Sequence, residues 1–324
     1  MKLSLPKIGF GGAPIGNLFR NIDDNESNEI LDEAFKNKIN YFDTSPLYGC
    51  GLSEIRIGQF IEDLNRKNLI ISSKVGRYLV EENTDSIDRG FFKSGLNYKT
   101  ILDYSYDGVL RSFEQSLKRL KTEYIDICLI HDVDYFNHGD KFEYYYDQSL
   151  KGAYLALQSL KNQKLINFIG IGVNDAEVAN RFILDEYFDY VLLAGRYTLL
   201  DQSASLNFFS NAEKKNIGVI LGGVFNSGIL SKGNTDSTYF YKAAPKEIID
   251  KYSNLRSICD YFNVPIRAAS IQFSLKPKVV DSIVLGMDMK TQIRDNLNNL
   301  KFNIPDEFWI KIHDLIMNNF NNIK

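Results

Sequence analysis

The sequence predicts a (β/α)8 barrel, for three reasons. Eight short runs rich in β-branched and aromatic residues alternate with helical patterns, which indicates parallel strands joined by right-handed crossovers. The length of 324 residues suits one barrel of roughly 250 residues with added loops. Three of the runs also end in polar residues, namely Asp43, Lys74 and His131. A barrel enzyme assembles its active site from such carboxyl ends of strands.

Each element follows from a local pattern. The apolar runs predict strands at residues 7–11, 40–43, 69–73, 125–130, 168–173, 190–193, 218–221 and 282–285. Apolar residues at helical spacing predict helices around residues 30–35, 109–120 and 150–160. Pro265 is expected at the first position of a later helix, and Pro305 is expected to open the last one. No linker, repeat or low-complexity block divides the chain, so we expect one domain over residues 1–324.

Two polar stretches exceed what a minimal barrel needs. Residues 78–106 are rich in glycine and asparagine, and residues 132–147 carry many tyrosines. Both follow the carboxyl ends of strands, so we expect loops at the catalytic face, where loops usually set the choice of substrate. The alternative is that both are merely solvated insertions.

The composition argues against several classes of partner. A net charge of −3 provides no broad basic field, so nucleic acid is not expected to bind. No apolar run of about 18 residues occurs, so we expect no membrane span. Cys50, Cys128 and Cys259 form neither a CxxC pair nor a metal-like cluster, which favours the reducing cytosol and no bound metal. We expect a cytoplasmic monomer or homodimer that acts on a small molecule.

Four residues at the expected strand ends form a set suited to hydride transfer: Asp43, Tyr48, Lys74 and His131. Tyr48 follows Asp43 closely enough to project from the same strand-to-helix loop. A free phenol has a pKa near ~10, and a lysine ammonium beside it is expected to lower that pKa. Asp43 would keep the lysine charged, and His131 would orient the substrate oxygen. Tyr48 is then the base when an alcohol is oxidised and the acid when a carbonyl is reduced.

The glycines of the N-terminal segment GFGGAPIG do not form a Rossmann fingerprint. After Gly9 and Gly11, the pattern GxGxxG requires glycine at position 14, where the chain has Pro14. We expect a nucleotide instead at a late loop and helix N-terminus. The segment VLGMDMKTQIRDN provides such a place, because Gly286 permits close approach of the backbone.

The motifs NYFDTSPLYGCG, ISSKVG and IDICLIHD resemble those of the aldo-keto reductases, and the resemblance runs from end to end. It implies a (β/α)8 barrel that binds NAD(P)(H) without a Rossmann domain. It also assigns Asp43, Tyr48, Lys74 and His131 to the catalytic tetrad of that family. The longer stretches DYSYDGVLRSFEQSLKRL, LLAGRYTLLDQ and GGVFNSGIL resemble the aldose 1-dehydrogenase branch. That branch holds L-fucose, L-galactose and D-arabinose dehydrogenases, together with pyridoxal 4-dehydrogenase-like members.

The same resemblance implies a set of cofactor contacts. They fall at Gly12, Asp43, Asn174, Gly223, Phe225, Gly286, Asp288, Gln292 and Asn296. Asn174 stands where a polar side chain holds the nicotinamide carboxamide, and the pattern that begins at Gly286 lies near the adenosine end. Two positions depart from the family: Ala194 replaces a glutamine that binds the carboxamide, and Gly222 replaces a ring-stacking aromatic. Phe225 is expected to take over some of that packing.

Asp288 bears on the choice between NAD and NADP. It stands where many NADP-dependent members have arginine or lysine, two residues after Gly286. Its carboxylate would repel a 2′-phosphate and accept a hydrogen bond from a ribose hydroxyl, although Lys290 and Arg294 are near in sequence. We expect NAD, with NADP as the alternative.

Together these residues predict an NAD(P)-dependent dehydrogenase that oxidises the anomeric hydroxyl of a small aldose to its lactone. Aromatic contacts from Tyr135, Phe136 or Phe225 would favour pyridoxal or another small aldehyde instead. An alternative from a different class is a nucleotide-binding regulatory subunit without significant turnover, which potassium-channel β-subunits resemble.

Overall fold

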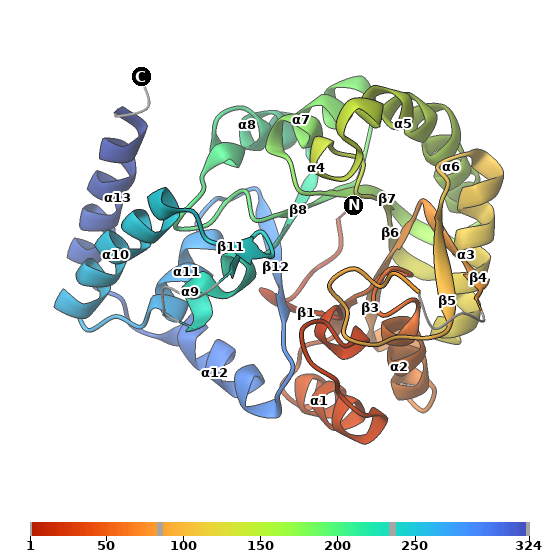
Figure 1. Cartoon of the computed structure of the whole chain (residues 1–324), viewed down its shortest axis with the longest axis horizontal. Helices are drawn as coiled ribbons and strands as arrows, with labels where there is room; N and C mark the ends of the chain where they lie inside the picture. Colours follow the sequence, from red (N-terminus) through yellow and green to blue (C-terminus); the bar gives the residue numbers. More distant parts are fainter. Residues whose placement is uncertain (1, 83–86, 233–237, 322–324) are drawn as a thin grey trace.

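The computed structural model describes residues 2–82, 87–232 and 238–321. Eight parallel strands close into a barrel with helices packed around it, which confirms the predicted fold (Figure 1). Around the barrel the strands are β1 (Ile8–Gly11), β12 (Val280–Gly286), β9 (Gly218–Gly222), β8 (Tyr190–Ala194), β7 (Ile166–Val173), β6 (Ile125–His131), β3 (Ile70–Val75) and β2 (Tyr41–Asp43). Each of the predicted strands overlaps one of these, and only the ends differ.

The helices form the outer layer of the barrel in Figure 1. The α-helices are α1 (Asp24–Lys36), α2 (Leu52–Ile61), α3 (Tyr106–Leu120), α4 (Tyr135–His138), α5 (Phe142–Gln148), α6 (Leu155–Asn162), α7 (Ala176–Asp185), α8 (Phe208–Lys214), α9 (Ile229–Lys232), α10 (Lys246–Tyr261), α11 (Ile266–Ser274), α12 (Lys290–Lys301) and α13 (Asp306–Asn321). The short helical turns are η1 (Pro14–Gly16), η2 (Arg66–Asn68), η3 (Gly139–Lys141), η4 (Ser149–Tyr154), η5 (Ser203–Ser205) and η6 (Asn226–Gly228). Pro265 caps α11 and is not its first residue, because its ψ of 128° is extended.

The first stretch that was expected to be a loop contains a β-hairpin. The antiparallel strands β4 (Arg77–Glu81) and β5 (Tyr98–Leu102) occupy much of it, and residues 83–86 lie outside the described part. Gln115 of α3 holds this hairpin, since its side chain bonds both the N–H and the C=O of Leu79 at 2.8 Å. The expectation of an irregular loop was therefore wrong here, because a distant glutamine completes the edge of the strand.

The second stretch is also regular, since α4, η3 and α5 span residues 135–148. The tyrosine-rich sequence forms a helix because Phe142 and Tyr146 of α5 are buried. The ring of Tyr146 lies 4.4 Å, centre to centre, from that of Phe182 on α7. A further short hairpin, β10 (Thr238–Tyr239) with β11 (Lys242–Ala243), was not predicted.

Two layers of core hold the barrel strands in place. Alternate strand residues fill the inside of the barrel, as the side-chain period of two requires. These inward residues are Tyr41, Ile127, Leu129, Tyr190, Leu192, Ile220 and Val284. The opposite faces of the strands pack against the helices in a larger cluster. Because all eight strands are parallel, their carboxyl ends meet at one rigid rim.

Within the part of the chain that the structure describes, none of the helices has both the length and the apolar character needed to cross a membrane.

Candidate active site

Three members of the predicted tetrad are joined by one ammonium group at the carboxyl rim of the barrel. Asp43 ends β2, Lys74 lies near the end of β3, and Tyr48 follows β2 in a loop. The Nζ of Lys74 donates to Oδ2 of Asp43 at 2.8 Å, to the carbonyl oxygen of Thr44 at 2.8 Å, and to the hydroxyl of Tyr48 at 3.2 Å. The three ammonium protons therefore each have a partner, which fixes the phenol relative to the carboxylate.

The second oxygen of Asp43 is held by a chain of hydroxyl groups. The Oγ of Ser72 donates to Oδ1 of Asp43 at 2.7 Å, and the hydroxyl of Tyr41 lies 3.0 Å from the same Oγ. Because Ser72 uses its proton on the carboxylate, Tyr41 must be the donor to Ser72. Both carboxylate oxygens of Asp43 therefore have hydrogen-bond donors in this buried setting.

The phenol of Tyr48 does not have the lowered pKa that the sequence predicts. Burial raises its pKa well above the ordinary value, and the negative charge of Asp43 raises it further. The expectation was wrong for the protein alone because Asp43 balances the charge of Lys74 at a distance of 2.8 Å. Tyr48 is therefore a protonated phenol, ready to act as an acid. Acting as a base requires an added positive charge near the ring.

His131, the last residue of β6, is uncharged. Burial lowers its pKa well below the ordinary value, and the positive charges of Arg77 and Lys74 act in the same direction. Its ring lies 6.2 Å from that of Tyr48, centre to centre, at an angle of 81°. The uncharged imidazole of His131 therefore lies nearly perpendicular to the ring of Tyr48.

The partners of His131 indicate which ring nitrogen carries the proton. Nδ1 lies 3.2 Å from Oγ of Ser45, and that Oγ already accepts the N–H of Leu47 at 3.1 Å. The Ser45 hydroxyl is therefore free to donate to Nδ1, which leaves the proton on Nε2. Nε2 lies 3.4 Å from Oδ1 of Asp132. His131 can accordingly donate to a substrate oxygen.

A second polar group, which was not expected from the sequence, lies beside His131. Oδ2 of Asp132 lies 3.2 Å from Nη1 of Arg77, and Oδ1 accepts from Nδ2 of Asn174 at 3.2 Å. The backbone N–H of Asn174 also donates to Oδ2 of Asp134 at 2.9 Å. Burial raises the pKa of Asp132, with Arg77 opposing that shift. Their positions in the sequence could have indicated this pair, because Arg77 follows Lys74 closely and Asp132 directly follows His131.

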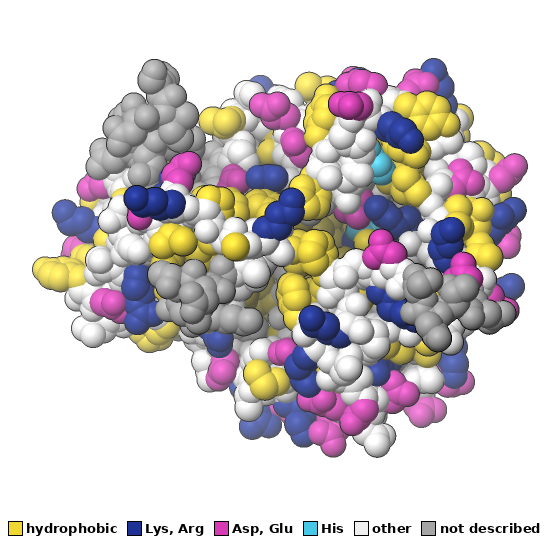
Figure 2. All heavy atoms as spheres, in the orientation of Figure 1, with side chains coloured by type: hydrophobic (Ala, Val, Ile, Leu, Met, Phe, Trp, Pro, Cys, Tyr) yellow, Lys and Arg dark blue, Asp and Glu magenta, His cyan; other side chains and the backbone are white. Residues whose placement is uncertain are grey.

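Aromatic side chains from three separate segments surround Tyr48. Its ring lies 5.9 Å from that of Phe92. Phe91 stacks on Tyr241 at 4.7 Å, and Phe19 lies 5.8 Å from the same tyrosine. Figure 2 shows this face of the molecule hollowed near its centre, where hydrophobic, basic and histidine side chains meet. The site therefore combines a polar wall with an aromatic one.

A sequence profile of the Aldo/keto reductase family matches residues 7–316. The chain belongs to this family. It is 35% identical over 319 residues to pyridoxal 4-dehydrogenase of Microbacterium luteolum, which covers 95% of this chain and 93% of the relative. It is 32% identical over 317 residues to D-threo-aldose 1-dehydrogenase of a Pseudomonas species, with 96% and 94% covered. The chain is therefore an oxidoreductase that uses NAD or NADP, and its resemblance to the aldose dehydrogenase branch is confirmed.

Solved structures support the same fold. A glycerol dehydrogenase from Gluconobacter oxydans superimposes with a TM-score of 0.74 at 21% sequence identity, covering 98% of this chain and 93% of that one. At this level of identity the likeness concerns the barrel and not the substrate.

The aromatic residues considered from the sequence have different surroundings in this aldo/keto reductase. Tyr135 and Phe136 are exposed, and the ring of Tyr135 stacks 4.0 Å from that of Phe142. Phe225 packs against the hydrophobic core. The hydroxyl of Tyr104 lies 3.2 Å from Nε2 of His138 and donates to the carbonyl oxygen of His131, so His138 lies behind the tetrad histidine.

The residues expected at the adenosine end of the cofactor form a connected group. Gln292 donates to Oδ1 of Asp288 at 2.7 Å and accepts its backbone N–H at 2.8 Å. Arg20 donates to Oδ2 of Asp288 at 2.9 Å. Gly286 is exposed at the rim, and Asn296 is buried on α12. The carboxylate at position 288 is thus neutralised by an arginine from a distant loop, which sequence spacing did not indicate.

The remaining expected contacts occupy different settings. Gly223 is exposed at the end of β9, where the backbone is accessible. Gly12 is needed for packing, because a Cβ there would lie 2.7 Å from Oγ of Ser53 and 2.8 Å from the carbonyl oxygen of Asp43. Asn174, which is expected to contact the nicotinamide, already donates from its amide nitrogen to Asp132.

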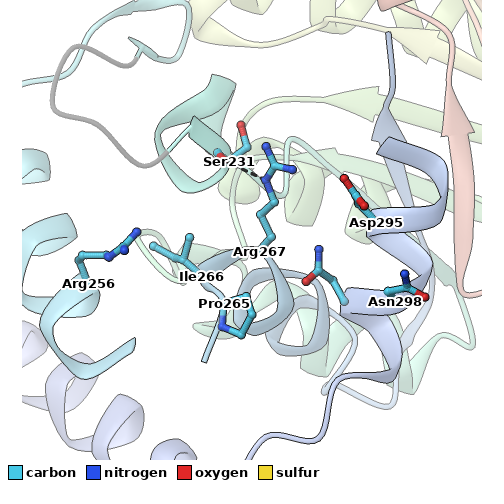
Figure 3. Close-up of a pocket in the computed structure, with 8 residues that line it drawn as sticks. Ser231, Arg256, Pro265, Ile266, Arg267, Asp295 and Asn298 are labelled. Atoms are coloured by element: carbon cyan, nitrogen blue, oxygen red, sulfur yellow. Dashed lines mark hydrogen bonds between the residues drawn. The ribbon is translucent and has the colours of Figure 1, made fainter. Parts of the chain in front are cut away.

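A surface pocket of about 410 Å³ lies outside the barrel, among α9, α10, α11 and α12 (Figure 3). Its lining includes Ser231, Arg267 and Asp295, and Arg267 donates to the carbonyl oxygen of Ser231 at 2.9 Å. The lining contains no member of the tetrad and none of the residues expected at the adenosine end of the cofactor.

Proposed function

We propose that this aldo/keto reductase is an NAD-preferring dehydrogenase that oxidises the anomeric hydroxyl of a small aldose to its lactone. The observation that carries the proposal is that Nζ of Lys74 bonds both the phenol of Tyr48 and the carboxylate of Asp43. The phenol of Tyr48 can therefore exchange its proton with a substrate while the ammonium of Lys74 remains charged and hydrogen-bonded to it.

The residues of the chain manage the proton in the oxidation. Tyr48, as the phenolate, takes the proton of the C1 hydroxyl. The C1–H bond breaks, its electron pair leaves with the hydrogen as hydride, and the C1=O bond of the lactone forms. The nicotinamide ring, when bound, supplies the acceptor for that hydride. Lys74 donates to the phenolate oxygen, and the oxidised nicotinamide, when bound, would supply the added positive charge that the phenolate needs. Nε2 of His131 donates to the substrate oxygen and orients it.

The polar wall supports a sugar as substrate. Asp132, Arg77 and Asn174 present a carboxylate, a guanidinium and an amide beside Nε2 of His131. Nη1 of Arg77 is buried and pairs with Oδ2 of Asp132 at 3.2 Å without forming a hydrogen bond among the described residues, so reorienting it toward a substrate hydroxyl would break no hydrogen bond of that nitrogen. A polyol matches such alternating donors and acceptors, and D-threo-aldose 1-dehydrogenase is 32% identical to this chain.

A flat aromatic substrate is the second candidate. The stacked pair Phe91 and Tyr241, with Phe92 beside Tyr48, would suit a pyridine ring. Pyridoxal 4-dehydrogenase is 35% identical to this chain, which favours the same candidate.

The preference for NAD rests on Asp288. Its carboxylate is near the exposed Gly286 in sequence and accepts a hydrogen bond from Arg20. The carboxylate would repel a 2′-phosphate, and the guanidinium of Arg20 is already paired and so is not free to bind one. A ribose hydroxyl would instead find an acceptor there.

The test is the reduction of NAD+ and NADP+ with L-fucose, L-galactose, D-arabinose and pyridoxal, using the wild type and Tyr48→Phe. Multiple turnovers with one aldose and NAD+, reduced at least about 10²-fold in the variant, are expected. Turnover of pyridoxal alone would replace the substrate and keep the mechanism. Near-normal turnover by Tyr48→Phe would overturn the mechanism, and stoichiometric cofactor oxidation without turnover would indicate a regulatory protein.

A further inference from the structure

The side-chain amide of Asn226 is buried, and it makes no hydrogen bond within the described residues. Only 2% of the residue is exposed, and neither Oδ1 nor Nδ2 has a hydrogen-bond partner within the described residues. Burying an amide without partners costs free energy. An unsatisfied buried group of this kind therefore needs an explanation, and a ligand that completes it is one.

Asn226 lies at the carboxyl rim of the barrel, where β8 and β9 end. A Cβ built on Gly195 would lie 3.8 Å from Nδ2 of Asn226. Gly195 directly follows β8, and its N–H donates to the carbonyl oxygen of Gly222 at the end of β9 at 2.9 Å. The next residue, Arg196, donates to the carbonyl oxygen of Asn174 at 2.5 Å. The amide thus belongs to the part of the rim that continues through Asn174 to the polar wall beside His131.

The backbone holds this amide in an uncommon conformation. Asn226 has φ of 45° and Ser227 has φ of 59°, so two successive residues are left-handed. The N–H of Asn226 donates to the carbonyl oxygen of Gly223 at 2.8 Å, which closes the turn. Asparagine tolerates this region better than most residues, and such conformations concentrate at ligand sites.

We propose that Asn226 binds the carboxamide of the nicotinamide. A carboxamide has one oxygen acceptor and one NH2 donor, which are the complements of Nδ2 and Oδ1 of asparagine. The adenosine end of the cofactor is expected at Gly286 and beyond, on another part of the rim. Ala194, next to Gly195, has no polar side chain, so Asn226 supplies the amide there from the neighbouring loop.

The role is one of positioning, and it rests on the nicotinamide cofactor of the family but not on the aldose. Binding measured without any sugar therefore tests it separately from the proposed substrate. Asn226→Gly removes the amide and keeps a residue that accepts positive φ. Ser227→Gly is the matched control, because it loosens the same turn and leaves the amide in place.

The measurement is the dissociation constant of NAD+ and of ADP-ribose, which lacks the nicotinamide, by isothermal titration calorimetry. Asn226→Gly is expected to weaken NAD+ binding about three- to tenfold, the range for one or two neutral hydrogen bonds. ADP-ribose binding should change less than about twofold, and Ser227→Gly should affect neither ligand by more. Ala194→Gln in the Asn226→Gly background should recover part of the lost affinity by restoring an amide beside Gly195.

A comparison on the wild type needs no variant. Nicotinic acid adenine dinucleotide carries a carboxylate in place of the carboxamide, so it lacks the donor for Oδ1 of Asn226. The wild type is expected to bind it several-fold more weakly than NAD+. Equal affinity for the two would overturn the proposal. So would an Asn226→Gly variant that binds NAD+ normally, or one that loses NAD+ and ADP-ribose affinity equally.

Discussion

The Nζ of Lys74 lies 2.8 Å from Oδ2 of Asp43, and the two side chains are only 2% and 4% exposed. A buried pair of this kind is stable only as a pair, because each charge compensates the desolvation of the other. The same ammonium also bonds Tyr48. The stability of the barrel rim and the chemistry of the phenol therefore depend on one lysine.

Replacing Lys74 with methionine should separate these two roles. Lys74→Met leaves the carboxylate of Asp43 buried and uncompensated, so the free energy of unfolding should fall by about 3–5 kcal/mol. The double variant Lys74→Met/Asp43→Asn removes both charges and should recover most of that loss while remaining inactive. Urea denaturation followed by fluorescence measures the difference. Equal stability of the single and double variants would show that the pair is not mutually compensating.

Ser45 should control the tautomer of His131. Ser45→Ala removes the donor to Nδ1, so a population with the proton on Nδ1 should appear and turnover should fall about two- to tenfold, the worth of one hydrogen bond. Long-range proton–nitrogen NMR can follow this change, because the chain has only three histidines. Thr44→Val is the matched control, since its hydroxyl lies 2.8 Å from Ser53 and not near His131. An unchanged tautomer in Ser45→Ala would refute the assignment.

The buried, neutral His131 should make the fold less stable in mild acid. Its folded pKa lies well below the ordinary value of 6.5. Between those two values the unfolded chain binds a proton that the folded chain does not, so stability rises with pH there and is lost as pH falls below about 6.5. The contribution to the slope is up to about 1.4 kcal/mol per pH unit. His131→Gln should lose this part of the slope between pH 6.5 and 5, and should match the slope of the wild type above pH 7.5. Identical slopes throughout would contradict a neutral His131.

Asp288 should govern the choice between NAD+ and NADP+. Asp288→Asn removes a negative charge and releases Arg20, so the ratio of the two dissociation constants should shift toward NADP+ by about tenfold or more, as expected for a hydrogen bond to a charged group. Glu26→Gln is the control, because Glu26 bonds Arg20 at 2.7 Å and leaves Asp288 intact. If Glu26→Gln shifted the ratio as far, the availability of Arg20 and not the carboxylate at position 288 would decide the preference.

Several features were predictable because they depend on neighbours in the sequence. The strands that carry Asp43, Lys74 and His131 were recognised from short apolar runs, and the structure brings their ends to one rim. The β4–β5 hairpin was not recognised, because Gln115 holds it from α3. The Arg77–Asp132 pair was missed for the same reason, since Arg77 begins β4 and Asp132 follows the end of β6.

The sequence by itself determined the barrel and the residue types that meet at its rim, because strand periodicity and the position of a polar residue at the end of a strand are local properties. Only the tertiary structure decided the protonation of those residues. Tyr48 has a raised pKa and His131 a lowered one because burial and the charges of Asp43 and Arg77 act on them across the barrel. The unpartnered amide of Asn226 is likewise a consequence of tertiary packing, since no pattern in the chain shows which polar atoms are left without a partner.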